Sequence, residues 1–374
     1  MTPPVHDIEK RLLQPAGAGD RVAALLELAA AHASAFRSKE GLRAAREALV
    51  AARAQGDGVS VGHALSIATV CHFQRSDYVA AVATGLDAVE AYAEDDVCGR
   101  SNALQSIALA LFNVGAHDVA STAALRAIRD ANACGEPGRE AAARSVLGLI
   151  LNQREEFNAA RREFRQAAAI HRREGDLVKL KKSTINLAHT YRYQGHKAAR
   201  GGAAPQARFY WTQACRVYRI ALDTGNAPPD DAIILGSLAE CELRLGRTGQ
   251  ALAASTRALQ QGVECPMILA PCLLWHGEVL QALGQLKAAE RACEQACHAA
   301  DRLEHDEIHV RARHMLSKLC DLQGRFQDAA DHERRSLELA ADRAAFLARV
   351  REDLEPLWTP YMGDGPASRP RRAA

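Results

Sequence analysis

The stretch LLWHGEVLQALGQLKAAERACEQA, residues 273–296, sets small residues at intervals within a segment of strong helix formers. Glycine inside a helix costs about 1 kcal/mol relative to alanine, so Gly277 and Gly284 each need a physical reason. Gly284 follows the first apolar segment, where left-handed backbone commonly ends a helix. Gly277 lies within that segment, where a missing side chain lets a second helix approach closely. The stretch therefore predicts two antiparallel helices joined by a short turn.

The same arrangement recurs eight times along the 374-residue chain. Each unit has an alanine shortly after its turn: Ala45, Ala81, Ala120, Ala160, Ala214, Ala251, Ala289 and Ala329. Twelve residues earlier, with one displaced member at Ala188, the residues are also small: Ala33, Thr69, Ala108, Gly148, Ala188, Ala239, Gly277 and Ser317. Seven residues later they are small again: Ala52, Ala88, Ala127, Ala167, Ala221, Ala258, Ala296 and Ser336. Recurrence of this pattern at intervals of 36 to 54 residues predicts an all-α solenoid of about eight helix-turn-helix repeats, wound as a right-handed superhelix.

These units resemble tetratricopeptide repeats across roughly residues 20–355. Two units carry the resemblance most fully: Leu273, Gly277, Leu280, Gly284, Ala289 and Ala296 in one, and Leu147, Gly148, Leu151, Phe157, Ala160, Phe164 and Ala167 in the other. The resemblance implies a non-catalytic protein that binds a protein or peptide partner. More loosely, the long units are similar to the repeat modules that precede diguanylate cyclase domains in bacteria. Only 19 residues follow Glu355 and no cyclase signature occurs, so cyclase activity is not expected.

A solenoid of this kind offers a concave surface lined by the first helix of each unit. The polar residues expected on that surface, and hence at the partner site, are Asn102, Gln105, Asn113, Asn152, Gln153, Lys182, His189, Arg192, Tyr193 and Arg244. Amide and basic side chains suit an extended peptide, whose backbone needs hydrogen-bonding partners. The function predicted is that of an adaptor or regulator. Two alternatives stay open: a sensor of a small ligand or signalling peptide, and an enzyme with a site at His189, Arg192 and Tyr193.

Residues 196–210 form an insertion that makes this turn about 14 residues longer than the others need, and Gly195 is assigned to the turn itself. The insertion is either a tolerated loop or a binding element that carries His196, Lys197, Arg200 and Arg208. Residues 171–200 hold eight Lys or Arg and only two acidic residues. That segment is either a solvated face or a docking surface for an acidic partner.

The two ends of the chain are set apart from the repeat array. Residues 1–19 form an N-terminal segment and residues 356–374 a tail that we expect to be partly disordered, with Pro356 ending the last helix. Trp358 and Tyr361 are unusual in such a tail. They either cap the apolar face of the final unit or dock elsewhere on the chain or on a partner.

Composition excludes several classes of function. The net charge is +2 with 25% charged residues, so no overall field favours nucleic acid or membrane as a partner. No signal-like or spanning apolar segment is evident, so we expect a soluble, cytoplasmic protein. Most of the ten cysteines are expected to be buried and reduced. The histidines and cysteines of residues 293–314 do not reproduce a zinc pattern, so no metal, cofactor or catalytic residue is predicted.

Overall fold

The computed structural model describes residues 5–12, 17–92, 96–225, 227–263, 265–301 and 306–359. Every regular element in these ranges is a helix, which confirms the predicted all-α fold. The helices are α1 (Val5–Leu12), α2 (Ala18–Ser34), α3 (Ser38–Gln55), α4 (Gly58–Gln74), α5 (Tyr78–Ala91), α6 (Val97–Asn113), α7 (His117–Cys134), α8 (Pro137–Gln153), α9 (Phe157–Glu174), α10 (Leu177–Arg200), α11 (Ala204–Leu222), α12 (Pro228–Arg244), α13 (Thr248–Gly262), α14 (Pro266–Ala282), α15 (Leu286–Asp301), α16 (Asp306–Leu322) and α17 (Phe326–Trp358).

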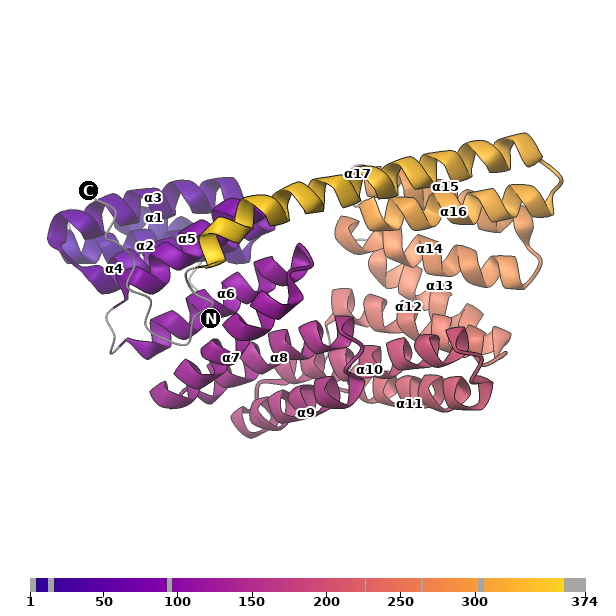
Figure 1. Ribbon diagram of the computed structural model, residues 1–374, viewed down its shortest axis with the longest axis horizontal. Coiled ribbons are helices and arrows are strands. Elements are labelled where there is room, and N and C mark those ends of the chain that lie inside the picture. Colours follow the sequence, from indigo (N-terminus) through magenta and orange to yellow (C-terminus); the bar gives the residue numbers. More distant parts are fainter. Residues whose placement is uncertain are drawn as a thin grey trace. The chain divides into compact units, whose positions relative to one another are not determined.

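The helices after α1 follow one another in the order first helix, turn, second helix, and they belong to two compact units (Figure 1). Unit 1 comprises residues 1–154 and 347–374, and unit 2 comprises residues 155–346. In unit 1, α6 packs against α5, α7 and α8. In unit 2, α10 packs against α9 and α11, and α12 packs against α13 and α14. Within each unit, neighbours in sequence are therefore neighbours in space, as expected of a repeat protein.

The small residues that define the repeat all lie in the protein interior. Each of the three predicted columns is buried in all eight units. A Cβ atom added to Gly277 would lie 2.9 Å from Sγ of Cys293 and 3.4 Å from the carbonyl oxygen of Ala289, both on α15. Gly277 therefore does allow the second helix of its pair to approach, as the sequence predicts.

The turns within the pairs each contain one residue with positive φ. Gly115, Gly246, Gly284 and Gly324 take this position with φ between 73° and 81°, which confirms their assignment as turn glycines. Three other pairs place a residue with a side chain there: Phe36 (φ 57°), Ser76 (φ 58°) and Glu155 (φ 59°). These three residues adopt left-handed backbone although it is unfavourable for L-residues.

Several helix starts follow from the sequence. Pro137, Pro228 and Pro266 each lie in the first turn of a helix, where a missing backbone N–H costs nothing. The side chain of Asp96 accepts a hydrogen bond from the backbone N–H of Gly99 at 2.9 Å, and Asp176 accepts one from Lys179 at 3.0 Å. Such caps satisfy backbone donors that have no partner within the helix.

The insertion is helical, and the assignment of Gly195 to a turn is wrong. The helix α10 continues to Arg200, and the turn lies at Gly201–Ala203, with Gly202 at φ 74°. The extra residues therefore lengthen α10 and α11 instead of forming a loop. Gly195 lies inside α10, where an added Cβ atom would be 2.5 Å from the indole ring of Trp211. At this position glycine therefore allows close packing against Trp211 and does not reverse the chain.

The last helix also differs from expectation. It continues through Pro356 to Trp358, because a proline near the end of a helix removes a single backbone hydrogen bond. Trp358 is 3% exposed and packs, with Val350 and Leu354, into the core that α5, α6, α7 and α8 form in unit 1. It does not cap the final unit, so the alternative of docking elsewhere on the chain is the one observed. Tyr361 lies outside the described residues.

Eight of the ten cysteines are free, and seven of these are buried, as the composition suggests. The remaining two, Cys98 and Cys134, form a disulfide whose Cα atoms are 5.5 Å apart. The sequence analysis did not anticipate this bond, since 36 positions separate the two residues.

Candidate functional site

All ten residues predicted for the partner site lie on first helices of their pairs. Five belong to unit 1, on α6 and α8: Asn102, Gln105, Asn113, Asn152 and Gln153. Five belong to unit 2, on α10 and α12: Lys182, His189, Arg192, Tyr193 and Arg244. The ten residues thus form two sets, one in each unit, which are described separately.

The set in unit 2 centres on a buried ion pair between α10 and α12. Nη1 of Arg192 donates to Oε2 of Glu240 at 2.7 Å, with 11% and 10% of the side chains exposed. Nε2 of His196 lies 3.1 Å from the other carboxylate oxygen of Glu240. The guanidinium carbon of Arg192 lies 4.9 Å from the ring centre of Tyr193, within the range of a cation–π contact.

A second ion pair continues the line onto the next two first helices. Nη2 of Arg311 on α16 donates to Oε1 of Glu278 on α14 at 3.0 Å. Arg244, which is exposed at the end of α12, also acts electrostatically on Glu278. We call these residues the charged row: Arg192, His196, Glu240, Arg244, Glu278 and Arg311. The charged row crosses the successive first helices α10, α12, α14 and α16 of unit 2.

Burial and neighbouring charges shift the pKa values in the charged row in opposite directions. Burial would raise the pKa of Glu240, yet the guanidinium of Arg192 and the hydrogen bond from His196 hold that pKa far below its usual range. Burial raises the pKa of Glu278, and the carboxylate of Glu240 adds to the increase. The row therefore contains one firmly ionised carboxylate and one that holds a proton more readily.

His189 lies beside the charged row on α10. Its ring centre is 5.6 Å from that of Tyr218, and its Nε2 atom is 3.4 Å from Oγ of Ser237. Burial lowers the pKa of His189 to about 3, and the charge of Arg192 contributes to the decrease. His189 is therefore neutral at physiological pH and cannot supply a fixed positive charge to a partner.

The sequence analysis missed Glu278 and Arg311 as site residues. A usable signal was nevertheless present, because His189, Glu240 and Glu278 each follow directly after the buried small residue that defines the repeat. In unit 1 the same register holds the exposed Ser34 and then three half-buried apolar residues, Val70, Leu109 and Leu149. From Val70 to Glu278, this register changes from apolar residues in unit 1 to polar ones in unit 2.

Much of the basic segment 171–200 is neutralised within the protein. Lys181 is 1% exposed, forms an ion pair with Asp231 and donates to the carbonyl oxygen of Gly225 at 2.8 Å. Lys197 and Arg200 both pair with Glu155. The segment is therefore not a continuous free docking surface, because a large part of its charge holds helices and turns together.

The lengthened α10 and α11 do line an open pocket of about 610 Å³ beside the start of α9. Phe157, Gln194, Lys197 and Tyr210 are among its lining residues. Of the four residues proposed for a binding element in the insertion, only Lys197 lines this pocket. His196 contacts the charged row instead, and Arg208 is exposed.

The predicted residues of unit 1 are less available to a partner. The side-chain amide of Asn113 donates to the carbonyl oxygen of Leu109 on its own helix at 2.8 Å. Asn152 is only 7% exposed. Asn102 and Gln153 are exposed and Gln105 is half-buried, so unit 1 offers a thinner polar surface than unit 2.

Two other classes of site, for a metal ion and for a membrane, concern the part of the chain that the structure describes. No group of three or more His, Cys, Asp or Glu side chains there could hold a metal ion. His305, which the sequence analysis considered as a ligand, lies outside the described residues. No described helix combines the length and apolarity that crossing a bilayer would require.

Comparison with known proteins agrees with this architecture. Residues 269–342, which begin within α14 and end within α17, match the tetratricopeptide repeat family. No curated protein matches the sequence. The fold of this chain is that of TPR-like helical repeat proteins.

Three solved structures illustrate the likeness. The Rap conjugation gene regulator of plasmid pLS20 in complex with the Phr* peptide has a TM-score of 0.59 at 11% identity, over 94% of this chain and 96% of that chain. A Rap protein complexed with Competence and Sporulation Factor has a TM-score of 0.58 at 15% identity, over 92% of each chain. The apo quorum sensor NprR from B. thuringiensis has a TM-score of 0.53 at 12% identity, over 87% of this chain and 100% of that chain. At such identities the likeness concerns the fold alone.

Proposed function

We propose that this chain is a cytoplasmic, non-catalytic regulator that binds a protein or peptide through the first helices of unit 2. The observation that carries the proposal is the charged row, in which α10, α12, α14 and α16 each contribute an ionisable side chain. Solved structures of similar fold include two complexes, one with a Phr* peptide and one with Competence and Sporulation Factor. A preformed surface on rigid helices lowers the entropy that binding costs.

The charges of the row favour an acidic group on the partner. Arg192 is paired with Glu240, and Arg311 is paired with Glu278. Arg244 is exposed, makes no ion pair within the described residues, and lies at the end of α12. Its guanidinium can donate two parallel hydrogen bonds to a carboxylate. An acidic side chain or a terminal carboxylate is therefore the group we expect to be recognised here.

The test pans the immobilised full chain against a random peptide library and measures enriched peptides by fluorescence anisotropy. Arg244→Glu reverses the exposed charge of the row. Arg216→Glu is the matched control, since Arg216 is exposed on α11, a second helix. Enriched peptides should carry carboxylates and bind Arg244→Glu about tenfold more weakly, because attraction becomes repulsion. Failure to enrich any peptide, or equal losses in both variants, would refute this function.

A sensor of a small ligand or signalling peptide is the second candidate, and the continuity of α17 favours it. Residues 326–346 of this helix belong to unit 2 and residues 347–358 belong to unit 1. Hydrogen exchange distinguishes the two functions once a ligand is in hand. If a peptide that needs Arg244 also changes exchange at residues 347–358, the chain is a sensor. Unchanged exchange there identifies a simple adaptor.

A further inference from the structure

The disulfide between Cys98 and Cys134 lies at the open end of a helix pair. Cys98 is in the first turn of α6, and Cys134 is the last residue of α7. At the other end of the same pair, the chain reverses through Gly115. The two antiparallel helices are thus joined by a turn at one end and by a covalent bond at the other.

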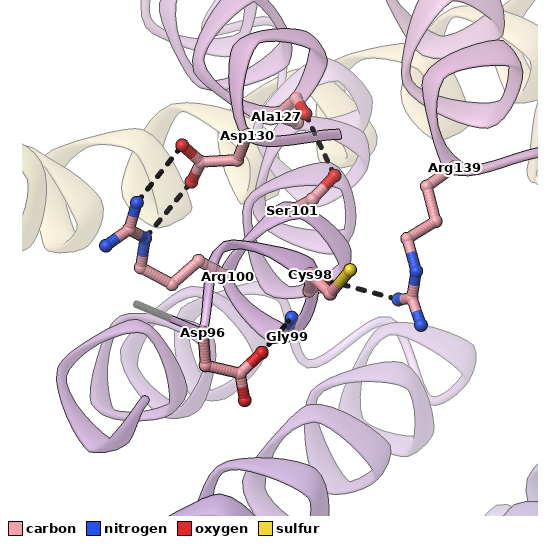
Figure 2. A network of polar contacts seen from close by, with 8 residues as sticks. All are labelled: Asp96, Cys98, Gly99, Arg100, Ser101, Ala127, Asp130 and Arg139. Atoms are coloured by element: carbon pink, nitrogen blue, oxygen red, sulfur yellow. Dashed lines mark hydrogen bonds and ion pairs between the residues drawn. The ribbon is translucent and has the colours of Figure 1, made fainter. Parts of the chain in front are cut away.

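Other contacts hold α6 and α7 together near Cys98, as Figure 2 shows. Nε and Nη2 of Arg100 donate to the two carboxylate oxygens of Asp130 at 3.1 and 3.2 Å. Oγ of Ser101 donates to the carbonyl oxygen of Ala127 at 2.9 Å. The reduced chain therefore retains a polar network and a packed seam between these helices, and we expect it to stay folded.

The residues of the disulfide are more accessible to solvent than every free cysteine except Cys265, which is also half-buried. Cys98 and Cys134 are both half-buried, whereas seven of the eight free cysteines are buried. Burial raises the pKa of the Cys293 thiol to about 12 and that of Cys71 to about 11. Such thiols are poor nucleophiles, because the thiolate is the reactive form. A soluble disulfide or thiol would therefore reach the Cys98–Cys134 pair and Cys265 in preference to the seven buried cysteines, and of these only Cys98 and Cys134 have a partner sulfur.

The surroundings of Cys98 favour its thiolate in the reduced chain. Its position in the first turn of α6 exposes it to the positive end of the helix dipole. Nη1 of Arg139, from the first turn of α8, donates to the carbonyl oxygen of Cys98 at 3.2 Å (Figure 2). The nearby carboxylate of Asp130 is neutralised by Arg100, and that of Asp96 caps α6. Cys134 lies at the negative end of α7, where the dipole disfavours a thiolate.

We propose that Cys98–Cys134 is a site of reversible thiol–disulfide exchange with a low-molecular-weight disulfide such as glutathione disulfide, and that Cys98 is the sulfur that exchanges first. In the forward reaction the Cys98 thiolate attacks one sulfur of glutathione disulfide and expels one glutathione thiolate, which leaves a mixed disulfide. The Cys134 thiolate then attacks the Cys98 sulfur and expels the second glutathione. Two protein thiols lose two electrons and two protons, and glutathione disulfide is reduced to two thiols. This activity is independent of the proposed partner binding.

The first experiment equilibrates the full-length folded protein in a series of glutathione to glutathione disulfide ratios, then alkylates free thiols and maps them by mass spectrometry. Cys98 and Cys134 should change together from alkylated to disulfide-bonded across the series, while the buried cysteines stay unmodified. If both remain alkylated at every ratio, or remain bonded at every ratio and in excess dithiothreitol, exchange does not occur and the proposal is wrong.

The second experiment identifies the attacking sulfur. Cys134→Ser should accumulate the glutathione mixed disulfide on Cys98 at least about tenfold faster than Cys98→Ser accumulates it on Cys134. Equal rates, or a faster reaction at Cys134, would overturn the assignment. Arg139→Gln keeps both cysteines, so it can replace the serine variants as the test if one of them does not fold. It should slow the reaction of Cys98 about threefold, whereas an unchanged rate would contradict the role given to Arg139.

Discussion

Gly236→Ala should destabilise the chain, although alanine is the better helix former. Gly236 is buried within α12, and an added Cβ atom would lie 1.9 Å from Cε3 of Trp275 on α14. Trp275 is 8% exposed and packs with Leu235 and Ile268. Its ring would have to move by about 1.5 Å to reach the 3.4 Å of ordinary contact. Surrounding side chains leave little space for that movement.

Two opposing terms set the magnitude of this change. Replacing a mid-helix glycine by alanine gains about 1 kcal/mol of helix propensity. Overpacking a tight interior costs about 1 to 3 kcal/mol, and a displacement of this size belongs at the upper end. We therefore expect a net loss of about 2 kcal/mol in the free energy of unfolding. Since Gly236 precedes Glu240 by one helical turn, the same variant should disturb the spacing of the charged row.

Urea denaturation followed by circular dichroism measures the effect. Gly249→Ala is the control, because Gly249 is an exposed residue of α13 with nothing within 4 Å of an added Cβ atom. That control should be neutral or more stable by up to about 1 kcal/mol. A second substitution, Trp275→Leu, should recover part of the loss in the Gly236→Ala background. If Gly236→Ala is as stable as the control, close approach of Trp275 to Gly236 does not set the spacing of α12 and α14.

Three further predictions concern single side chains. Ser76→Gly should raise the free energy of unfolding by about 1 kcal/mol in urea titration, since Ser76 has φ 58°; no gain would show that this turn carries no strain. Glu240→Gln should lower the free energy of unfolding by about 3 kcal/mol, because Arg192 is left buried without its counter-ion; an unchanged value would contradict that. The pKa of His189 is about 3 in the folded chain and about 6.5 in the unfolded chain, so the folded chain binds this proton only at a lower pH. Stability should therefore fall as the pH decreases from 6.5 towards 3, by up to about 1.4 kcal/mol per pH unit. The His189→Gln variant should lose that part of the slope in thermal melts, and equal slopes would refute the assignment.

The repeat architecture could be predicted from the sequence because its cause is local and recurrent. Burial of Ala45, Gly277 and their counterparts follows from a packing requirement that every unit shares. Gly195 illustrates the limit of that reasoning. In the printed sequence it has the same appearance as the turn glycine Gly284, and only the position of Trp211 shows that it serves packing within a longer helix. A pattern that recurs in eight units is readable, whereas a departure confined to one unit depends on contacts between distant residues.

The candidate site was partly predictable for a related reason. Arg192 and Arg244 were found because polar residues on a first helix stand out against its apolar pattern. Glu278 and Arg311 were missed because each, taken alone, resembles an ordinary solvated charge. Their significance comes from their pairing across helices α14 and α16, at a separation of 33 residues. The Cys98–Cys134 bond escaped prediction for the same reason, since it joins residues 36 positions apart.

The contrast between the two units bears on how such a fold acquires a function. The register that holds Val70, Leu109 and Leu149 in unit 1 holds His189, Glu240 and Glu278 in unit 2. Both sets follow a buried small residue, so the backbone geometry of the repeat does not determine their polarity. A charge that is buried at this register, as on Glu240, loses solvation and needs a counter-ion on a neighbouring helix, which is a cost that an apolar residue avoids. The charged row meets that requirement with Arg192 and Arg311, from adjacent repeats. Apolar residues would stabilise the fold at least as well as such a row of buried ion pairs. This is the physical argument for proposing that unit 2 recognises the partner.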